Sequence, residues 1–450
     1  MAVDSSTKPL DIGIIGGGLA GSFAAVALGR LPNTKITVYE KSPAATEVGA
    51  WISLTNATFD VLTRFIDSDK LNGIAFRGDP NNEYVTRHWK TGEIIYTQET
   101  FNRSRPFVEA RTHRIPLHNL ILEHVPSNVE IKYDSNVASI TSSPEGITIN
   151  AKYDKKDRHD LVVVADGIYS RIRQQFFPKG AIKYKGVVAY RSVFPESLVS
   201  HITDLPSDTS VWAKSGSVVF LSKLGLGQYG VVAIISEPEA TAGKLKWNRG
   251  TGEWGRKRLK EFFDQWDSRI NQVIQIVPEI LAFPLESGPW LSNLVVDDQI
   301  AFIGDAAHPT SGVYGAGASF GFSDAWALYR SLQETSSNHW VRAATVANKY
   351  NIKLALFLFN ETRRYFLQRV EKQIAIDAEV GRDHLSKAKD DKEWTDKYLI
   401  VRSGGEWMRS HNVELEYQKV RDQYSVLLQR NLTSFQTLGH GLTEWDIPKL

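Results

Sequence analysis

Three segments that lie far apart in the chain have the residue types that bind a dinucleotide. The first is the glycine-rich run Gly16 to Gly21, the second is Asp166-Gly167, and the third runs from Gly304 and Asp305 to Pro309. Glycines let a backbone approach a pyrophosphate closely, and carboxylates accept hydrogen bonds from sugar hydroxyls. A lone Gly-x-Gly-x-x-Gly pattern is weak evidence. The three segments in this order predict one tightly held FAD.

The first segment lies in a pattern of strand, turn, helix and strand. Residues 11–15 are expected to form a buried strand, residues 22–28 an alanine-rich helix, and residues 35–40 a second strand that ends at an acid. The start of the helix presents free N–H groups to a phosphate. Gly16, Gly18 and Gly21 would permit the tight turn and the close packing of helix on strand. We expect Glu40 to accept hydrogen bonds from the adenosine ribose, with Lys41 beside it in the cofactor site.

The other two segments also follow expected strands. Residues 161–165 are apolar and β-branched, as in a central parallel strand, and lead into Asp166 and Gly167. Residues 300–303 lead into Asp305, which is expected to hold the ribityl hydroxyls. Taken alone, Asp166-Gly167 also fits a plain surface turn, and Asp305 also fits a cap. His308 is expected to be structural rather than a base, and no metal ligands stand at suitable spacing.

A glycine-rich loop completes the expected cofactor site. The amides of Gly315, Gly317 and Ala318 are expected to face the N1–C2=O edge of the flavin, with Pro309 in the same cradle. Negative charge accumulates at that edge when the flavin is reduced. The positive end of a helix beginning there would stabilise this charge.

Composition narrows the class of protein. Of 450 residues, 42% are hydrophobic and 23% are charged, which predicts a folded globular protein. The net charge of +2 gives no reason to expect nucleic acid or an anionic membrane as a partner. The chain has no cysteine, so redox chemistry must come from a cofactor. Residues 1–8 lack the apolar segment of a signal peptide, and no apolar run reaches the roughly 18 residues of a membrane span. We therefore expect a cytoplasmic protein without stable membrane insertion.

The pattern of elements predicts an α/β fold with a discontinuous first domain. Residues 9–183 and 285–335 are expected to form an FAD-binding Rossmann-like domain of the GR2 type. A β-rich substrate-binding region is expected at 184–284, with parts of 80–110, and a helical C-terminal region at 336–450. Strands are expected at 186–194, 217–221 and 228–236, and a helix over 255–278.

Longer stretches resemble the single-component FAD-dependent aromatic monooxygenases, which include para-hydroxybenzoate and salicylate hydroxylases. Residues 161–173 are similar to that family's second fingerprint, and residues 301–325 to its third. Residues 114–117 match the family's Arg-x-x-Leu, which implies that Arg114 lies along the ribityl and phosphate chain. The resemblance runs from about residue 11 to 330, and it is greatest to fungal enzymes that oxidise phenols or indole alkaloids in secondary metabolism.

Two departures from the family pattern concern the flavin. Ser319 stands where the family has asparagine, which weakens the expected contact at the flavin edge. The family's Gly-Ala-Gly-Ile is Gly49-Ala50-Trp51-Ile52 here, with Gly49 and Ala50 expected in the cofactor site. Trp51 either narrows the substrate pocket, offers a stacking face, or packs in the core.

The resemblance implies that NAD(P)H reduces FAD, that O2 forms a C4a-hydroperoxyflavin, and that one oxygen atom is inserted into an electron-rich aromatic substrate. In similar fungal enzymes an arginine at the place of Arg191 binds or polarises the substrate. Tyr190 and Glu47 are the other candidate catalytic residues, although strand alternation puts Tyr190 on the face opposite Arg191. A surface ion pair remains an alternative for Arg191, and a solvated position for Glu47.

Other reactions remain open on the same motifs. Epoxidation of an indole at the 2,3 bond, followed by rearrangement, would give a spiro-oxindole. A flavin oxidase would reduce O2 without inserting oxygen, and a non-catalytic protein of this fold would only bind a ligand. A flavin-dependent halogenase would need a Trp-x-Trp-x-Ile-Pro segment, which the sequence lacks. Turnover of NAD(P)H and the mass of the product distinguish these alternatives.

Overall fold

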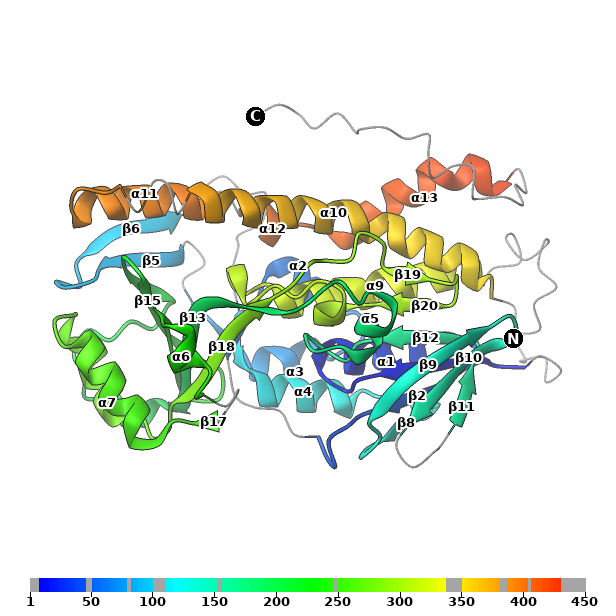
Figure 1. The fold of residues 1–450 in the computed structure, drawn as a ribbon, viewed down its shortest axis with the longest axis horizontal. Coiled ribbons are helices and arrows are strands. Elements are labelled where there is room, and N and C mark those ends of the chain that lie inside the picture. The colour runs from blue at the N-terminus through cyan, green and yellow to red at the C-terminus, as the bar shows by residue number, and fades with distance from the viewer. Residues whose placement is uncertain are drawn as a thin grey trace.

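Two large sheets and the helices around them form the structure, which is a computed structural model (Figure 1). It describes residues 8–45, 51–78, 82–99, 110–151, 156–245, 249–336, 350–380, 385, 387–403 and 406–429. None of the helices in these ranges combines the length and the apolar character that crossing a membrane requires.

The first sheet has six strands and brings the three motif segments together. Its order is β19 (Val295–Val296), β20 (Ile300–Phe302), β12 (Leu161–Val164), β1 (Leu10–Ile15), β2 (Thr34–Tyr39) and β8 (Val129–Lys132). All neighbours pair in parallel except β19 and β20. β1, β12 and β20 therefore end at the same edge. Ligands of open α/β sheets bind outside this edge, beyond the carboxyl ends of the strands.

Helices and a three-stranded sheet bury the faces of this sheet. α1 (Leu19–Gly29) contacts α4 (Arg114–Glu123) and α9 (Gly317–Thr335), and the long α10 (Ile352–Val380) packs on α9. The central strands are apolar at nearly every position because both of their faces are covered. A three-stranded sheet of β9 (Val137–Ser143), β10 (Gly146–Ala151) and β11 (Lys156–His159) lies beside them (Figure 1).

A fully buried ion cluster fixes the third motif segment to these helices. Asp324 of α9 lies 2.6 Å from Nε2 of His308 and 2.7 Å from Nε of Arg363, and it accepts the backbone N–H of Gly304 at 2.9 Å. Burial alone would raise the pKa of Asp324. The interactions of the carboxylate with His308 and Arg363 outweigh burial and lower the pKa to about 2. One carboxylate thus ties the segment to α9 and α10.

The second sheet has eight strands. Their order is β17 (Arg249–Gly250), β18 (Leu281–Ser287), β13 (Lys183–Pro195), β16 (Gln228–Ser236), β15 (Ser217–Leu224), β14 (Ser210–Lys214), β5 (Asn82–His88) and β6 (Ile94–Glu99). One face packs against a hydrophobic cluster that includes α7 (Gly252–Phe263) and α8 (Ser268–Ile276). β3 (Trp51–Leu54), β7 (Ala110–His113) and β4 (Phe76–Arg77) form a small sheet of their own.

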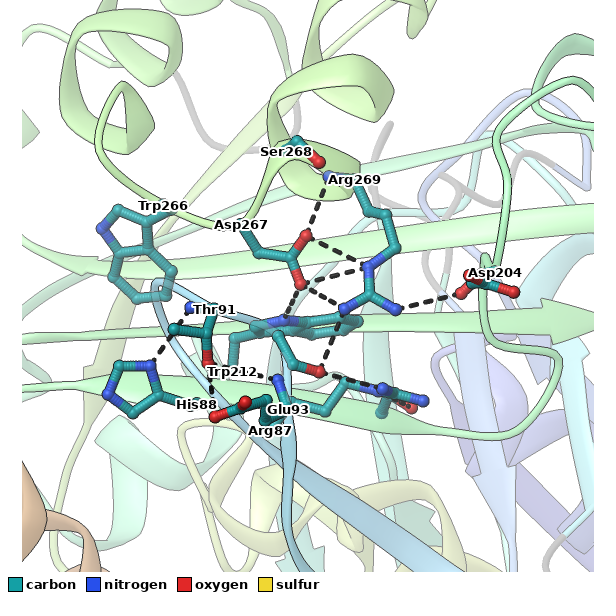
Figure 2. A network of polar contacts seen from close by, with 12 residues as sticks. Arg87, His88, Thr91, Glu93, Asp204, Trp212, Trp266, Asp267, Ser268 and Arg269 are labelled. Carbon is teal, nitrogen blue, oxygen red and sulfur yellow. Dashed lines mark hydrogen bonds and ion pairs between the residues drawn. The ribbon is translucent and has the colours of Figure 1, made fainter.

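The helix expected over residues 255–278 is wrong in one respect, because it is two helices. Asp267 interrupts it with an extended backbone and caps α8 by accepting the N–H of Arg269 at 3.0 Å. Figure 2 shows the same carboxylate at the centre of a polar network, where it accepts the indole N–H of Trp212 at 2.8 Å. Arg269 and Arg87 both donate to the carbonyl oxygen of Gly92 at 3.0 Å. The break therefore anchors the β5–β6 hairpin to the sheet.

Four further helices follow α9 in the described part of the chain. They are α10, α11 (Asp391–Ser403), α12 (Glu406–Arg409) and α13 (Val413–Gln429). α11 lies near β5, β6 and β15 in Figure 1, at the end of the molecule opposite the three-stranded sheet. The second sheet thus carries helices of the C-terminal region as well as α7 and α8.

Substituting Arg363 with methionine should destabilise the protein by about 3–5 kcal/mol, because Asp324 would keep its buried charge and lose one of its two side-chain partners. Urea unfolding at pH 7 measures the loss. Arg421→Met is the matched control, since Arg421 pairs with Asp422 on the surface and should change stability by less than about 1 kcal/mol. Equal effects of the two substitutions would contradict the role assigned to the cluster.

Candidate active site

A cavity of about 520 Å³ is lined by residues of both large sheets. Its nucleotide end lies at the carboxyl edge of the six-stranded sheet, and its other end is formed by the eight-stranded sheet. Seven of the residues expected to bind the cofactor line it: Gly18, Arg114, Gly167, Asp305, Gly315, Gly317 and Ala318. Gly16, Gly21, Glu40, Lys41, Asp166 and Pro309 do not line it. Glu47, Gly49 and Ala50 lie outside the described residues.

The turn between β1 and α1 accepts only glycine at two positions. A Cβ atom built on Gly16 would lie 2.4 Å from the carbonyl oxygen of Ala165, and one on Gly21 would lie 2.0 Å from that of Gly16. The turn is therefore as tight as a pyrophosphate site requires. No side chain caps the first N–H groups of α1, and its first turn contains no acid. These free donors fit an anion.

Glu40 lies at the end of β2 and is held against the same turn. Its carboxylate accepts the N–H of Gly17 at 2.7 Å and the N–H of Ser42 at 2.8 Å. An ionised carboxylate has about four acceptor positions, so these bonds leave capacity for ribose hydroxyls. The side chain of Lys41 is exposed.

The two aspartates of the other segments lie in different surroundings. Asp305 lines the cavity with an exposed side chain. The surrounding protein still raises its pKa by desolvation, although His308, Arg114 and Arg173 oppose the shift. Burial also raises the pKa of Asp166. Its Oδ2 accepts the N–H of Arg171 at 3.1 Å, and its buried Oδ1 has no hydrogen-bond partner within the described ranges. The carboxylates of Asp305 and Asp166 are therefore both suited to accept hydrogen bonds from a polar ligand.

His308 and Pro309 shape the loop instead of lining the cavity. The imidazole of His308 is buried between Asp324 and the rings of Trp290 and Phe320. The carbonyl oxygen of Pro309 accepts hydrogen bonds from Ser287 at 2.9 Å and Trp290 at 3.3 Å. These contacts join the loop to the strand β18 and to the segment that follows it.

The start of α9 is the third part of the cradle. No side chain caps its first N–H groups, and Gly315, Gly317 and Ala318 line the cavity there. Gly315 has φ +63°, which glycine adopts without strain. Ser319 does not line the cavity. Its buried hydroxyl faces a separate space of about 20 Å³, between α2 (Asn56–Leu62) and α9.

Period-two alternation decides what the eight-stranded sheet presents to the cavity. Arg191 of β13 pairs with Val232 of β16, which pairs with Phe220 of β15. The adjacent row on the same face holds Ala189, Ile234 and Val218. All but Ala189 line the cavity, together with Phe283 of β18. We call this end, defined by Arg191, Val218, Phe220, Val232, Ile234 and Phe283, the substrate chamber.

Arg191 is the charged side chain of this apolar chamber. Its guanidinium lies 4.9 Å from the ring centre of Phe283. Within the described ranges it forms no ion pair, and its buried Nε has no hydrogen-bond partner. Burial, together with the positive charge of Arg114, lowers the pKa of Arg191 to about 10, so the group remains a cation at neutral pH. The alternative of a surface ion pair does not describe this side chain.

Tyr190 faces the other way, so we remove it from the site. Its hydroxyl donates to Glu237 at 3.2 Å, and Glu237 also pairs with Arg258. The ring is almost fully buried in the core between the sheet and the helices α7 and α8. This position serves packing rather than chemistry.

Trp51 and Tyr398 are two of the lining residues that were not predicted as site residues. Trp51 lines the cavity, and its ring lies against Gly230, where a Cβ atom would be 2.4 Å from Cε3 of the indole. The sequence offered Trp51 only as an ambiguous departure. Tyr398 comes from α11, and nothing in its sequence surroundings points to a cavity.

The comparisons with known proteins agree with this geometry. No family model matches the chain. The chain is 25% identical over 367 residues to 6-hydroxynicotinate 3-monooxygenase of Pseudomonas fluorescens, covering 78% of this chain and 88% of the relative. It is 24% identical over 387 residues to the FAD-dependent monooxygenase OpS4 of Beauveria bassiana, covering 82% and 84%. The chain is thus similar over most of its length to FAD-dependent monooxygenases and hydroxylases of aromatic compounds.

A solved structure supports the fold. The crystal structure of CtdE in complex with FAD and substrate 4 superposes with a TM-score of 0.74 at 16% identity, covering 94% of this chain and 100% of that one. Together with the sequence relatives, this likeness indicates an FAD-dependent oxidoreductase that uses NAD(P)H and O2. The glycine turn, the two helix starts without side-chain caps and Asp305 at the cavity supply the kinds of donor and acceptor that fit FAD.

Asp305→Ala and Glu40→Ala should each weaken FAD binding about 10- to 150-fold, because a hydrogen bond to a charged group contributes about 1.5–3 kcal/mol. Titration of the apoprotein with FAD, followed by flavin fluorescence, gives the two dissociation constants. Asp264→Ala, on the exposed end of α7, is the control and should leave them unchanged. Parent-like affinity in both variants would mean that FAD lies elsewhere.

Proposed function

We propose that the protein inserts one atom of O2 into an electron-rich aromatic ring, a phenol or an indole, that lies in the substrate chamber with an oxygen atom on Arg191. The observation that supports this proposal is a half-buried cation that has no counterion among the described residues and lies among the apolar side chains of the chamber. Burying an unpaired charge is costly unless a ligand compensates it. A phenolate, carboxylate or carbonyl oxygen would do so.

The walls of the chamber favour a flat ligand. Phe220, Phe283 and Trp51 offer aromatic faces, and Val218, Val232 and Ile234 offer branched apolar surface. Aromatic rings stack or meet edge to face in such surroundings, beyond what burial alone contributes. The chamber would therefore take the ring of the substrate by contact with its faces and fix its orientation by a charged hydrogen bond.

Known relatives support the charged contact. The name of one relative gives 6-hydroxynicotinate as its substrate, and the name of another gives salicylate. Both molecules are aromatic rings that carry a hydroxyl and a carboxylate. A planar guanidinium binds a carboxylate with two parallel hydrogen bonds. We extend the same charged contact to this chain. Its proposed substrates also include the phenols and indoles of fungal-type secondary metabolism.

The roles of the residues follow from their positions. FAD, when bound, supplies the redox chemistry that activates O2. Gly315, Gly317 and Ala318 would hold its ring at the start of α9, and Arg114 and Asp305 would hold its chain. The apolar walls keep water from the reacting atoms. Arg191 would hold the substrate oxygen and stabilise negative charge that develops on it.

Turnover in 18O2 tests the proposal. Phenols, hydroxylated aromatic acids and prenylated indoles are screened for substrate-stimulated NAD(P)H oxidation, and the product is weighed. One labelled oxygen atom is expected. Unlabelled product would remove the monooxygenase reaction, and the structure of the labelled product separates hydroxylation from epoxidation with rearrangement to a spiro-oxindole.

Arg191→Ala should lower kcat about 100-fold or more with normal FAD content, because the lost contact stabilises the transition state by a few kcal/mol. Arg191→Lys should recover only part of the rate, since an ammonium cannot reproduce the bidentate fork. Stopped-flow and steady-state rates with the substrate found in the screen measure both. Arg158→Ala, in the exposed three-stranded sheet, should behave as the parent does. Equal rates in Arg191→Ala and the parent would exclude Arg191 from the site.

A further inference from the structure

One wall of the cavity comes from the C-terminal helices. Tyr398 of α11 lines the same cavity as Arg191. Every other lining residue among those described belongs to residues 18–318. α11 therefore brings a side chain to the cavity from a part of the chain that supplies none of the nucleotide motifs.

The start of α11 is fixed to the eight-stranded sheet. The indole N–H of Trp89, which follows β5, donates to Asp391 at 2.8 Å. Nζ of Lys214, the last residue of β14, lies 3.6 Å from the ring centre of Trp89. α11 also packs on β14. A hydrogen bond and a cation–π contact thus set where the helix begins.

The ring of Tyr398 has a fixed orientation on this helix. Trp394, one turn earlier and 8% exposed, stacks on it with ring centres 5.1 Å apart and planes inclined by 13°. Residues four apart share a helix face, so the indole backs the phenol ring on the side of the sheet. The stack sets the orientation of the ring where it forms part of the cavity wall.

The strand order shows which end of the chamber this wall closes. The sheet runs β18, β13, β16, β15 and β14. Phe283 and Arg191 lie on the first two strands, whereas α11 packs on β14. Neighbouring strands are 4.7–4.9 Å apart, so β13 and β14 are separated by about 14 Å. A substrate held by Arg191 therefore points its far substituent toward Tyr398.

We propose that Tyr398 is a specificity-determining residue that contacts the end of the substrate remote from Arg191 and limits the length of its substituent. The proposal rests on the proposed function, because it takes Arg191 as the other anchor. The ring and hydroxyl of Tyr398 favour a short substituent. Removal of the ring would open space for a longer apolar one.

Equilibrium binding of 4-alkylphenols, from 4-methylphenol to 4-hexylphenol, tests this proposal without turnover. The FAD-loaded protein is titrated in the absence of NAD(P)H, and the change in flavin absorption gives each dissociation constant. In Tyr398→Ala, affinity should rise about fourfold for each CH2 group that enters the new space, while it levels off earlier in the parent. The shortest phenol should bind roughly threefold more weakly in the variant, because it loses the ring contact.

Three further variants separate the causes. Tyr398→Phe keeps the ring and should keep the parent's dependence on chain length. Trp89→Phe removes the hydrogen bond to Asp391 and should shift that dependence in the direction of Tyr398→Ala with FAD content retained. Lys392→Ala, whose side chain is 87% exposed on the same helix, should change nothing. If the alanine variant loses FAD, Tyr398→Leu takes its place, with a smaller shift expected.

The results separate this proposal from the proposed function. Parallel length profiles in the parent, Tyr398→Ala and Tyr398→Leu would overturn the role of Tyr398, whatever the 18O2 result. A shifted dependence of affinity on chain length, together with unlabelled product, would support the role of Tyr398 and overturn the monooxygenase reaction. Failure of the parent to bind any phenol of the series would overturn the wall proposal together with the phenol form of the function.

Discussion

The parallel pairing of β1 with β12, and of β12 with β20, is the constraint on which the site depends. Because the three strands run in one direction, the segments that follow them emerge at one edge although they are more than a hundred residues apart in the chain. Hydrogen bonding sets this register, and apolar burial on both faces secures it. Backbone geometry alone therefore brings the glycine turn, Asp166 and Asp305 to one edge of the sheet.

The charges of Asp324 and Arg191 have opposite surroundings. Asp324 is surrounded by His308, Arg363 and a backbone N–H, so its charge is compensated within the protein and serves to hold the flavin loop in place. Arg191 has no such partner among the described residues. The low dielectric constant of the interior strengthens the ion pairs of Asp324. It also makes the unpaired charge of Arg191 costly, so that binding of a ligand oxygen is favoured. The scaffold and the substrate site therefore use one physical effect for different ends.

The residues that sequence could predict are those with local signals. The strand and turn patterns predicted that Gly18, Asp305 and the start of α9 lie at one site, because glycines, acids and apolar runs report the backbone nearby, and all three line one cavity. Arg114 lines the same cavity, but it was predicted from the family resemblance and not from a local pattern. Alternation likewise separated Arg191 from Tyr190. The break at Asp267 was missed, since the apolar positions on both sides keep helical spacing while the carboxylate accepts the indole N–H of Trp212 on β14. No local pattern reports such long-range partners.

The substrate end of the cavity is where local signals fail for a physical reason. Its shape depends on pairs such as Trp51 on Gly230, in which a large ring fits only because the opposing strand has no side chain there. It also depends on α11, whose position follows from Trp89 and Asp391, about 300 residues apart. Each residue alone looks like ordinary core or surface.

The motifs for the cofactor all serve one ligand, FAD, so short patterns of residues suffice to report them. The substrate wall is assembled from distant elements, and each can change one side chain without disturbing the nucleotide site. This separation lets the chamber differ in length and chemistry while the flavin cradle stays the same.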